Sequence, residues 1–594
     1  MKIKLFNFLG VIALLCSWSV YSQTVTNQST LNNAISAAGP GTTIILANSG
    51  IWNDVTISIN KNGNATNPII IKAETPGAVI FSGKTNVKLG GSYIYFEGVV
   101  FQNPPAMVTT GTPLIEFRAS NTDCNNCKVT NIKIDSFNQS SSQQTEVFKW
   151  ILLRGHHNEI SYCSFLGKHG VGSIINDNRE TNIENFHKIH HNYFANRKPQ
   201  STSVVNADND QDAIRLGNSS TSLSDSSSEV YENYFYNFVG EIEVISNKSG
   251  NNKYYNNTFE NYSGALTLRH GNNCEVYNNF FLANGYAFSG GVRVMGENHK
   301  IYNNYIEGVR SRYPNGNLSS GVGGINIANG RNDGVLNGYF PVKNTIIINN
   351  TFVNCDYGIR IGTKFSSTQS VAPDNVVVGN NILFVNTTMP NTNSNRAIQV
   401  TTNLTGASSK YENNISQTGV FDAFGTIVAT GNINVASGLL ASDGDLYRVK
   451  SGSAAIDYGL GSYGFLINDV FGAARPVMFD AGAEEFGASG TRLPYKQADL
   501  GVSVGFGGSE ALNITENTIR ENNLHIYPVP IKGSYLNVSL EKQHLGQVQI
   551  IDMLGRTVVK SYFNTSKGQV DIDNLTHGSY IIKVQGISKM IVVQ

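Results

Sequence analysis

Charge is the first thing that this sequence has little of. Asp, Glu, Lys and Arg together make up 14% of the 594 residues, and their formal charges sum to zero. Without a net basic field the chain has no general attraction for nucleic acid, so a polyanionic ligand would need a local cluster of cations. The length also exceeds what one ordinary hydrophobic core supports, unless the core belongs to a repeat array that grows in one dimension.

Long apolar segments are also missing. The apolar run near the N-terminus, from Phe8 to Leu15, is too short to span a bilayer, so we expect no transmembrane segment. It follows Lys2 and Lys4 and is followed by small residues up to Ser22, which is the pattern of a secretory signal peptide. We predict a signal peptide over residues 1–22, and therefore an exported protein.

Cysteine is scarce, and five cysteines remain after the predicted cleavage: Cys124, Cys127, Cys163, Cys274 and Cys355. An odd number in an exported protein leaves at least one thiol free. The Cys124-x-x-Cys127 pair has no second pair to complete a zinc site, so it indicates a local disulfide. For the other three cysteines, a role as small buried side chains is as consistent with the sequence as a disulfide.

Proline is scarce too, whereas Asn and Gly are frequent, a mixture that suits tight turns between short strands better than long helices. An Asn-containing pattern recurs from about residue 160 to residue 383. Its shortest spacings, between Asn233, Asn257, Asn279 and Asn304, are 22 to 25 residues. Repeats of this length predict a solenoid, and Asn at a fixed turn position favours a parallel β-helix over residues 23–486. Leucine-rich repeats lack the required Leu spacing here, and a propeller needs longer repeats.

The C-terminal part has a different composition. Residues 487–523 are rich in Gly, Ser and Asn, so we predict a linker, and residues 524–594 alternate apolar and polar positions as in a small antiparallel β-sandwich. This tail resembles the C-terminal sorting domain of the type IX secretion system through Tyr527-Pro528-Val529-Pro530, Asp552-Met553-Leu554-Gly555-Arg556 and Lys589-Met590-Ile591-Val592-Val593. The resemblance implies export through the outer membrane, to the cell surface or beyond, with the secretion machinery as partner. The alternative is a spacer or a carbohydrate-binding module.

The densest chemistry lies between Gly240 and Lys248. Glu241 and Glu243 are two residues apart, so in a strand they share a face, and we expect that face to be the outer one, with Ile242 and Val244 in the core. Two neighbouring carboxylates suit calcium, which prefers several oxygen ligands.

Adjacent coils add charge to the same wall. Arg269 follows Glu243 by 26 residues, close to one repeat, and Asn209 lies one coil earlier. Spacing alone leaves two interpretations equally open, which are a functional site and a salt-bridge ladder on a solvated sheet.

The segment resembles polysaccharide lyase family 6, which holds alginate lyases and chondroitinase B on a right-handed parallel β-helix. The matching residues are Glu241-x-Glu243, Ser246-x-Lys248-Ser249, Arg269-His270-Gly271, Asn278-Asn279-Phe280-Phe281 and Ala213-Ile214-Arg215-Leu216-Gly217. The similarity spans roughly residues 24–486.

The resemblance implies a role for each matching position. Calcium (Ca2+) ligands fall on Asn209, Glu241 and Glu243, with Asp210 or Asp212 as substitutes for Asn209. Lys248 matches the Brønsted base and Arg269 the acid or charge stabiliser, while His270 or a water protonates the leaving oxygen. For substrate carboxylates in flanking subsites the expected partners are Arg215, Arg293, Arg312 and Arg360, each of which has a solvated surface charge as its alternative.

The resulting hypothesis is a calcium-dependent lyase that cleaves an acidic polysaccharide, alginate first, by β-elimination. A chondroitinase B-type lyase on dermatan sulfate is the enzymatic alternative, although sulfate recognition would want more cations around the cleft. A non-catalytic β-helix adhesin that binds glycans would have no need of Lys248 and Arg269 beside an acidic pair. A hydrolase would use its carboxylates as acid and base without a metal.

Overall fold

The structure is a computed structural model, and it describes residues 22–594 except 201–208, 387–395, 507–523, 541–543, 553–555 and the single positions 530, 532, 586 and 594. The predicted signal peptide and the second half of the predicted linker therefore lie outside the described residues. The chain divides into two compact units, residues 1–502 and 503–594.

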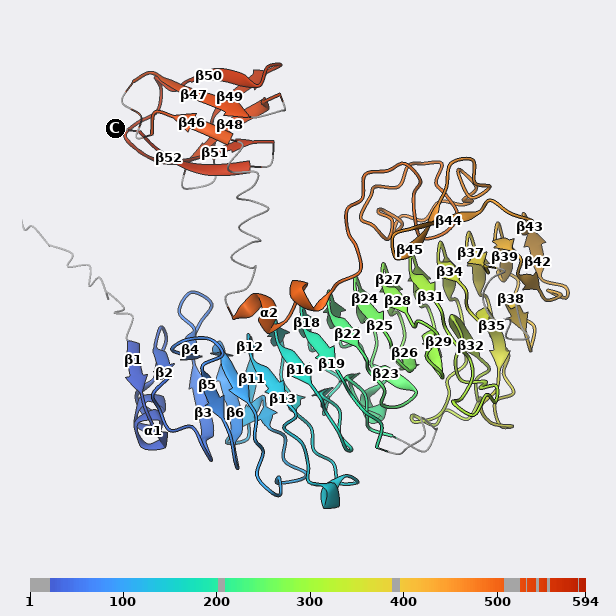
Figure 1. Cartoon of the computed structure of the whole chain (residues 1–594), viewed down its shortest axis with the longest axis horizontal. Coiled ribbons are helices and arrows are strands. Elements are labelled where there is room, and N and C mark those ends of the chain that lie inside the picture. The colour runs from blue at the N-terminus through green and yellow to red at the C-terminus, as the bar shows by residue number, and fades with distance from the viewer. Residues whose placement is uncertain are drawn as a thin grey trace, which may run out of the picture. The chain divides into compact units, whose positions relative to one another are not determined.

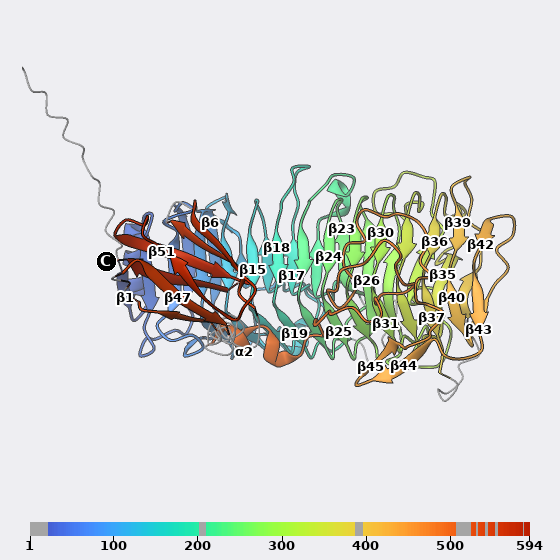
Figure 2. The same cartoon turned by 90° about the horizontal axis from the view of Figure 1, so that it is seen from above.

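The first unit is a parallel β-helix, as the repeats predict (Figure 1). Three long sheets run along it. The first extends from β1 (Ser22–Val25) to β42 (Val428–Thr430), and the third from β5 (Val79–Phe81) to β43 (Ile433–Val435). Strand neighbours within each sheet come from successive coils, so the coils stack along the long axis (Figure 2).

The second sheet carries the residues of interest. Its main strands, in spatial order, are β6 (Asn86–Ser92), β9 (Ile115–Glu116), β14 (Ile151–Leu153), β17 (Ile175–Asp177), β20 (Ile214–Leu216), β23 (Glu243–Lys248), β26 (Gly264–His270), β29 (Ser289–Val294), β32 (Ile325–Ala328), β35 (Tyr357–Thr363), β38 (Arg396–Val400) and β41 (Val420–Phe421).

The recurring Asn pairs explain why these residues coil. The first Asn of a pair, such as Asn256 or Asn278, has a positive φ of 57°, a conformation that Asn tolerates better than most residues. The second is buried and hydrogen-bonds its counterpart on the next coil: the Asn257 Nδ2 donates to Asn279 Oδ1 at 3.0 Å, and the Asn279 Nδ2 donates to Asn304 Oδ1 at 2.9 Å. These bonds form a ladder of amides along the coils, which satisfies polar groups that would otherwise be costly inside the solenoid.

Apolar side chains fill the interior in the same periodic way. Phe194, Phe235, Phe259 and Phe281 stack with ring centroids 4.5 to 4.8 Å apart on successive coils. Ring stacking of this kind adds to the free energy gained by burying the rings themselves.

At the N-terminal end, helix α1 (Gln28–Ala37) packs against the first coils through buried Leu31 and is capped by Asn27.

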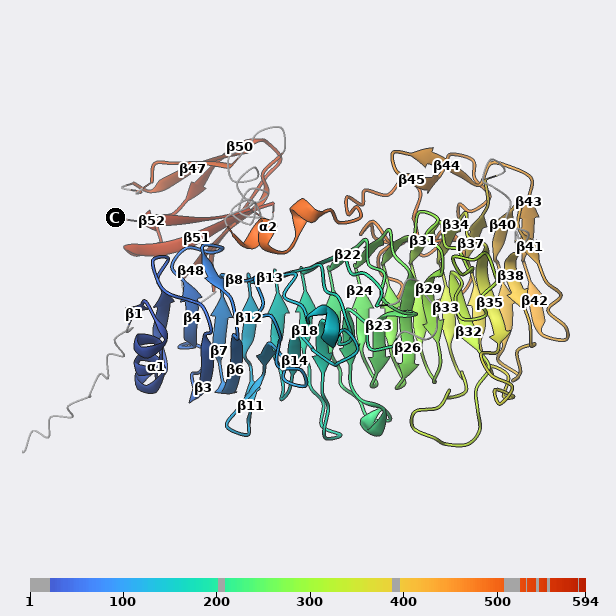
Figure 3. The same ribbon diagram turned by 60° about the horizontal axis from the view of Figure 1, so that its bottom comes forward.

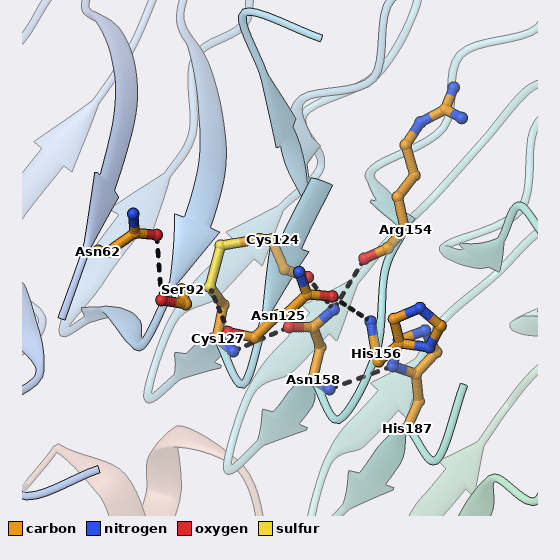
Figure 4. Close-up of a disulfide and its surroundings, with 9 residues drawn as sticks. All are labelled: Asn62, Ser92, Cys124, Asn125, Cys127, Arg154, His156, Asn158 and His187. Carbon is orange, nitrogen blue, oxygen red and sulfur yellow. Dashed lines mark hydrogen bonds between the residues drawn. A yellow bond between two sulfur atoms is a disulfide. The ribbon is translucent and has the colours of Figure 1, made fainter. Parts of the chain in front are cut away.

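A disulfide joins Cys124 to Cys127 at the turn between β11 (Thr122–Asn125) and β12 (Lys128–Thr130) (Figure 4). Asn158 of the next coil accepts from the Cys127 N–H at 2.8 Å and donates to the Cys124 carbonyl at 2.7 Å. The local disulfide is thus confirmed over a zinc site, and the thiols of Cys163, Cys274 and Cys355 are free and buried.

The segment after the last coil packs back against earlier coils of the β-helix. After the hairpin of β44 (Leu440–Asp443) and β45 (Leu446–Val449), the chain returns along the third sheet towards earlier coils. The Tyr495 N–H donates to Thr258 Oγ1 at 2.9 Å, and the Gly501 N–H donates to the His191 carbonyl at 2.9 Å. Residues 487–502, predicted as linker, therefore pack against the β-helix, because buried Leu500 and these backbone bonds hold them there. The short helix α2 (Val502–Gly505) follows.

The second unit consists of two antiparallel sheets around one apolar cluster, as predicted for the tail. One sheet contains β46 (Leu524–Tyr527), β47 (Tyr535–Leu540) and β50 (Lys567–Asp571). The other contains β49 (Thr557–Phe563), β48 (Gly546–Asp552), β51 (Gly578–Val584) and β52 (Ile587–Val593).

Candidate active site

A cleft of about 480 Å³ opens on the outer side of the second sheet, over β23, β26 and β29, which lie side by side (Figure 3). It brings together seven of the residues predicted from the sequence. The lining residues are Asn209, Ser219, Glu241, Ile242, Glu243, Lys248, Arg269, His270, Arg293, Tyr313, Ser320, Gly321, Asn337, Tyr339 and Phe365.

The register between β23 and β26 determines which side chains face the cleft. Glu243 pairs with Ala265 and Lys248 with His270, and between them the register shifts twice. Such bulges change the direction of a side chain. The prediction that Ile242 faces the core is wrong. Ile242 lies in the bend just before β23, where the alternation of a strand does not apply, and it is half-buried and lines the cleft beside the two glutamates. Glu243 and Arg269 do lie on adjacent coils, although they are not directly opposite.

The two glutamates form a buried acidic pair. Glu241 accepts from the Gln211 N–H at 2.8 Å, and Glu243 accepts from the Ser246 hydroxyl and lies 3.3 Å from the Arg293 guanidinium. Burial, followed by repulsion from Asp212 and Glu243, raises the pKa of Glu241 well above its usual range. A cation between the carboxylates would relieve both effects, so the donor set fits calcium.

In the coil before β23, the structure distinguishes Asn209 from the alternative metal ligands Asp210 and Asp212. Arg215 forms ion pairs with Asp210 and with buried Asp212, at 2.9 Å for the latter, and Asp212 also accepts from the Ser173 hydroxyl at 2.6 Å. Both aspartates are thereby engaged, whereas Asn209 lines the cleft. This arrangement favours Asn209 over its neighbours as the third oxygen ligand. Among the described residues, no group of three or more His, Cys, Asp or Glu side chains is placed to hold a metal.

Lys248 and His270 lie side by side where β23 and β26 end. Lys248 is half-buried and lines the cleft, where a molecule from solvent can reach its amine. His270 is buried, and burial together with the charges of Arg269 and Lys248 lowers its pKa to about 2. The His270 imidazole is therefore neutral near neutral pH, which makes it a poor source of the proton for a leaving oxygen.

Arg269 is held by a loop from a later coil, residues 331–341, which we call the cleft loop. Its guanidinium donates to the Gly338 carbonyl at 2.6 Å and to the Asn337 carbonyl at 2.9 Å, and it lies 4.1 Å from the centroid of the Tyr339 ring. This contact has no periodic signal in the sequence, because the loop is an insertion between β32 and β33 (Ile346–Ile348).

The four predicted substrate-binding arginines take different positions. Arg293 lines the cleft, is 3% exposed, and its Nε has no hydrogen-bond partner among the described residues. Arg215 is occupied by the aspartates. Arg312 pairs with Asp356 at 3.7 Å, and Arg360 donates to the Val322 carbonyl at 2.8 Å and to other groups. Neither Arg312 nor Arg360 lines the cleft.

The fold and the cleft define the class of protein: a parallel β-helix with an acidic pair and three cationic side chains in one cleft on its second sheet. Residues 25–438 match the family model described as Chondroitinase B, and the chain belongs to this family. Residues 525–594 match the model of a secretion system C-terminal sorting domain, so the protein is exported by that system to the cell surface or beyond. Within the described residues, no helix is long and apolar enough to cross a membrane.

Solved structures with the same fold include several polysaccharide lyases. The family 6 alginate lyase AlyGC is 30% identical over 73% of this chain, with a TM-score of 0.64, and the chain spans only 55% of AlyGC. A mannuronic acid-specific family 6 lyase from human gut microbiota is 23% identical over 70% of this chain and 92% of its own, with a TM-score of 0.57. The family 6 polysaccharide lyase Pedsa3628 from Pseudopedobacter saltans is 21% identical over 81% and 98%, with a TM-score of 0.55. No curated protein matches the chain.

Proposed function

We propose that this protein is a polysaccharide lyase that cleaves a uronate-containing polysaccharide, alginate, by calcium-assisted β-elimination. The observation that carries the proposal is the meeting of Lys248, Arg269 and the Glu241–Glu243 pair in one cleft. A salt-bridge ladder would pair these charges with one another, but the only ion pair between the acidic pair and a cation is Glu243–Arg293 among the described residues. The membership of the chondroitinase B family adds to this support.

Lys248 and Arg269 have different roles in the proposed reaction. Lys248 is the base that takes the proton from C5 of the uronate. The electron pair left at C5 forms the C4–C5 double bond as the bond from C4 to the glycosidic oxygen breaks. The departing oxygen takes a proton from water or from the new Lys248 ammonium. Arg269 stabilises the negative charge that develops on the uronate carboxylate, because a guanidinium keeps its proton and contributes electrostatically.

Asn209, Glu241 and Glu243 would hold the calcium ion. When bound, the ion supplies Lewis-acid withdrawal of charge from the substrate carboxylate, which makes the C5 proton easier to remove. Arg293, with its unpartnered Nε, is the residue placed to bind a second carboxylate of the polymer.

Alginate fits the cleft better than a sulfated chain does. Sulfate groups would require further cations, but Arg312 and Arg360 are engaged elsewhere and Arg215 is paired with two aspartates. The cleft therefore offers Lys248, Arg269 and Arg293 as its cations among the described residues, which suits carboxylates alone.

The test is the ultraviolet absorbance of unsaturated uronate during incubation with alginate and, separately, with dermatan sulfate. We expect absorbance to grow on alginate. Growth on dermatan sulfate alone would overturn the substrate and keep the chemistry. If the folded protein produces no absorbance increase on either substrate, the lyase proposal is overturned and a glycan-binding adhesin is favoured.

A further inference from the structure

Two aromatic rings connect the cationic side chains of the cleft. Tyr339 lies under Arg269 at 4.1 Å, and Phe365 lies under Arg293 at 5.0 Å. The two rings also contact each other, with centroids 5.3 Å apart and an interplanar angle of 53°. The chain of contacts therefore runs from one arginine to the other through Tyr339 and Phe365, and all four line the cleft.

The two rings come from loops that sequence periodicity does not place. Tyr339 belongs to the cleft loop, and Phe365 follows the end of β35 by two residues. The cleft loop is closed on itself, because the Arg331 N–H donates to the Tyr339 carbonyl at 2.7 Å and the Gly338 N–H donates to the Val335 carbonyl at 2.7 Å. A closed loop presents its carbonyls and the Tyr339 ring in a fixed arrangement, which favours a holding function.

A guanidinium on a flexible stem loses rotamer freedom when it is fixed, so an arginine that must stabilise charge benefits from being fixed in advance. Arg269 is fixed from two directions. Its edge donates to the carbonyls of Asn337 and Gly338, and its face lies on the Tyr339 ring. An aromatic face attracts a cation most strongly when water is partly excluded, as at half-buried Tyr339.

We infer that Tyr339 is a positioning residue, which with the cleft loop holds the Arg269 guanidinium towards the substrate, while Phe365 supports both Tyr339 and Arg293. The inference rests on the proposed function for its catalytic meaning. It predicts that the Tyr339 ring, and not its hydroxyl, is what matters.

The first arm of the test needs no activity. The full chain and its variants are treated with phenylglyoxal, which modifies accessible guanidinium groups, and labelling of Arg269 is followed by peptide mass spectrometry. Tyr339→Ala should raise the rate of Arg269 labelling about tenfold, from the strength of a cation–π contact. Tyr339→Phe should stay at the wild-type rate. Leu336→Ala, which removes an exposed side chain from the same loop, is the matched control.

The second arm measures turnover. Tyr339→Ala should lower kcat about tenfold with a smaller change in KM, and Tyr339→Phe should restore it. In an Arg269→Ala background, Tyr339→Ala should cause no further loss, because a positioning residue acts only through the residue that it holds.

Three results would overturn the inference: unchanged Arg269 labelling in Tyr339→Ala, equal behaviour of Tyr339→Phe and Tyr339→Ala, or a rise in kcat that shows the loop to be inhibitory. If the wild-type protein forms no unsaturated product, the proposed function fails. The labelling arm then still decides whether Tyr339 holds Arg269.

Discussion

Lys248 is the side chain on which the proposed chemistry depends most, because it is the candidate base in the cleft. Its replacement by Ala should lower kcat by about 10³-fold, which is within the range of general-base catalysis. Lys253→Ala is the control, since Lys253 is exposed on β24 (Lys253–Tyr255) of the first sheet. Turnover is measured by product absorbance, and circular dichroism checks that both variants are folded. A fully active Lys248→Ala enzyme would contradict the proposed mechanism.

Glu241 is the residue through which calcium binding is tested directly. Glu241→Gln removes one of two carboxylate ligands, so the calcium affinity measured by titration calorimetry should fall at least about tenfold. Glu275→Gln provides the control, because Glu275 pairs with Lys300 outside the cleft. Equal affinities in the two variants would place the ion elsewhere.

His270 makes stability depend on pH. Its pKa in the folded protein, about 2, lies below the ordinary value of 6.5. The unfolded chain therefore binds the proton more readily, and the stabilisation present above pH 6.5 is lost as the pH falls towards 2. Between pH 7 and pH 5 the free energy of unfolding should decrease by about 2 kcal/mol more in the wild type than in His270→Gln.

Denaturant unfolding at the two pH values measures this difference, with His577→Gln as a control at an exposed position of the second unit. A His270→Gln variant with the same pH dependence as the wild type would show that His270 is not held neutral by burial.

For single residues, the sequence predicts the location of side chains that belong to a repeat or match a motif. It does not predict the location of side chains that do neither. Glu241, Lys248 and Arg269 were accessible through spacing and resemblance, and all of them line the cleft. Ile242 was misplaced because β23 begins only at Glu243, so the alternation assumed for a strand does not extend to Ile242. Tyr339 was not considered, because an inserted loop has no periodicity from which to locate it.

Among the elements of the fold, the Asn ladder is the one that holds successive coils in register. Asn279 donates to Asn304 and accepts from Asn257, so Asn279→Ala leaves buried amide and backbone groups unpaired. The free energy of unfolding should decrease by about 2 kcal/mol. The exposed Asn332→Ala is the control, calorimetry is the measurement, and equal stability of the two variants would contradict the ladder's role.

The strands were predictable because each coil repeats an Asn turn followed by bulky apolar residues, which a parallel β-helix alone satisfies. The path of residues 440–502 was not. Residues up to 486 were predicted to belong to the β-helix, and the Gly-, Ser- and Asn-rich composition of residues 487–523 suggests a linker. Yet Leu500 is buried and Tyr495 bonds to Thr258 across 237 positions of sequence. Composition reports local preference and carries little information about a distant surface that a segment can cover.

For the whole molecule, the division into two units separates the cleft from the sorting domain. Every residue that lines the cleft lies in the first unit. A chain that ends at residue 506 should therefore keep kcat/KM within about twofold of the full chain, since each unit has its own core. It should no longer be exported. Assays of the purified protein measure kcat/KM, and assays of the culture supernatant measure export. Loss of turnover on truncation would contradict the division into two independent units.

The most direct test of the central claim is the absorbance of unsaturated uronate from alginate, measured with calcium and then with a chelator. The account predicts absorbance that grows with calcium, stops on chelation and returns when calcium is restored. Growth that continues unchanged in the chelator would contradict the role assigned to Asn209, Glu241 and Glu243. No growth in either condition, from folded protein, would contradict the assignment as an alginate lyase.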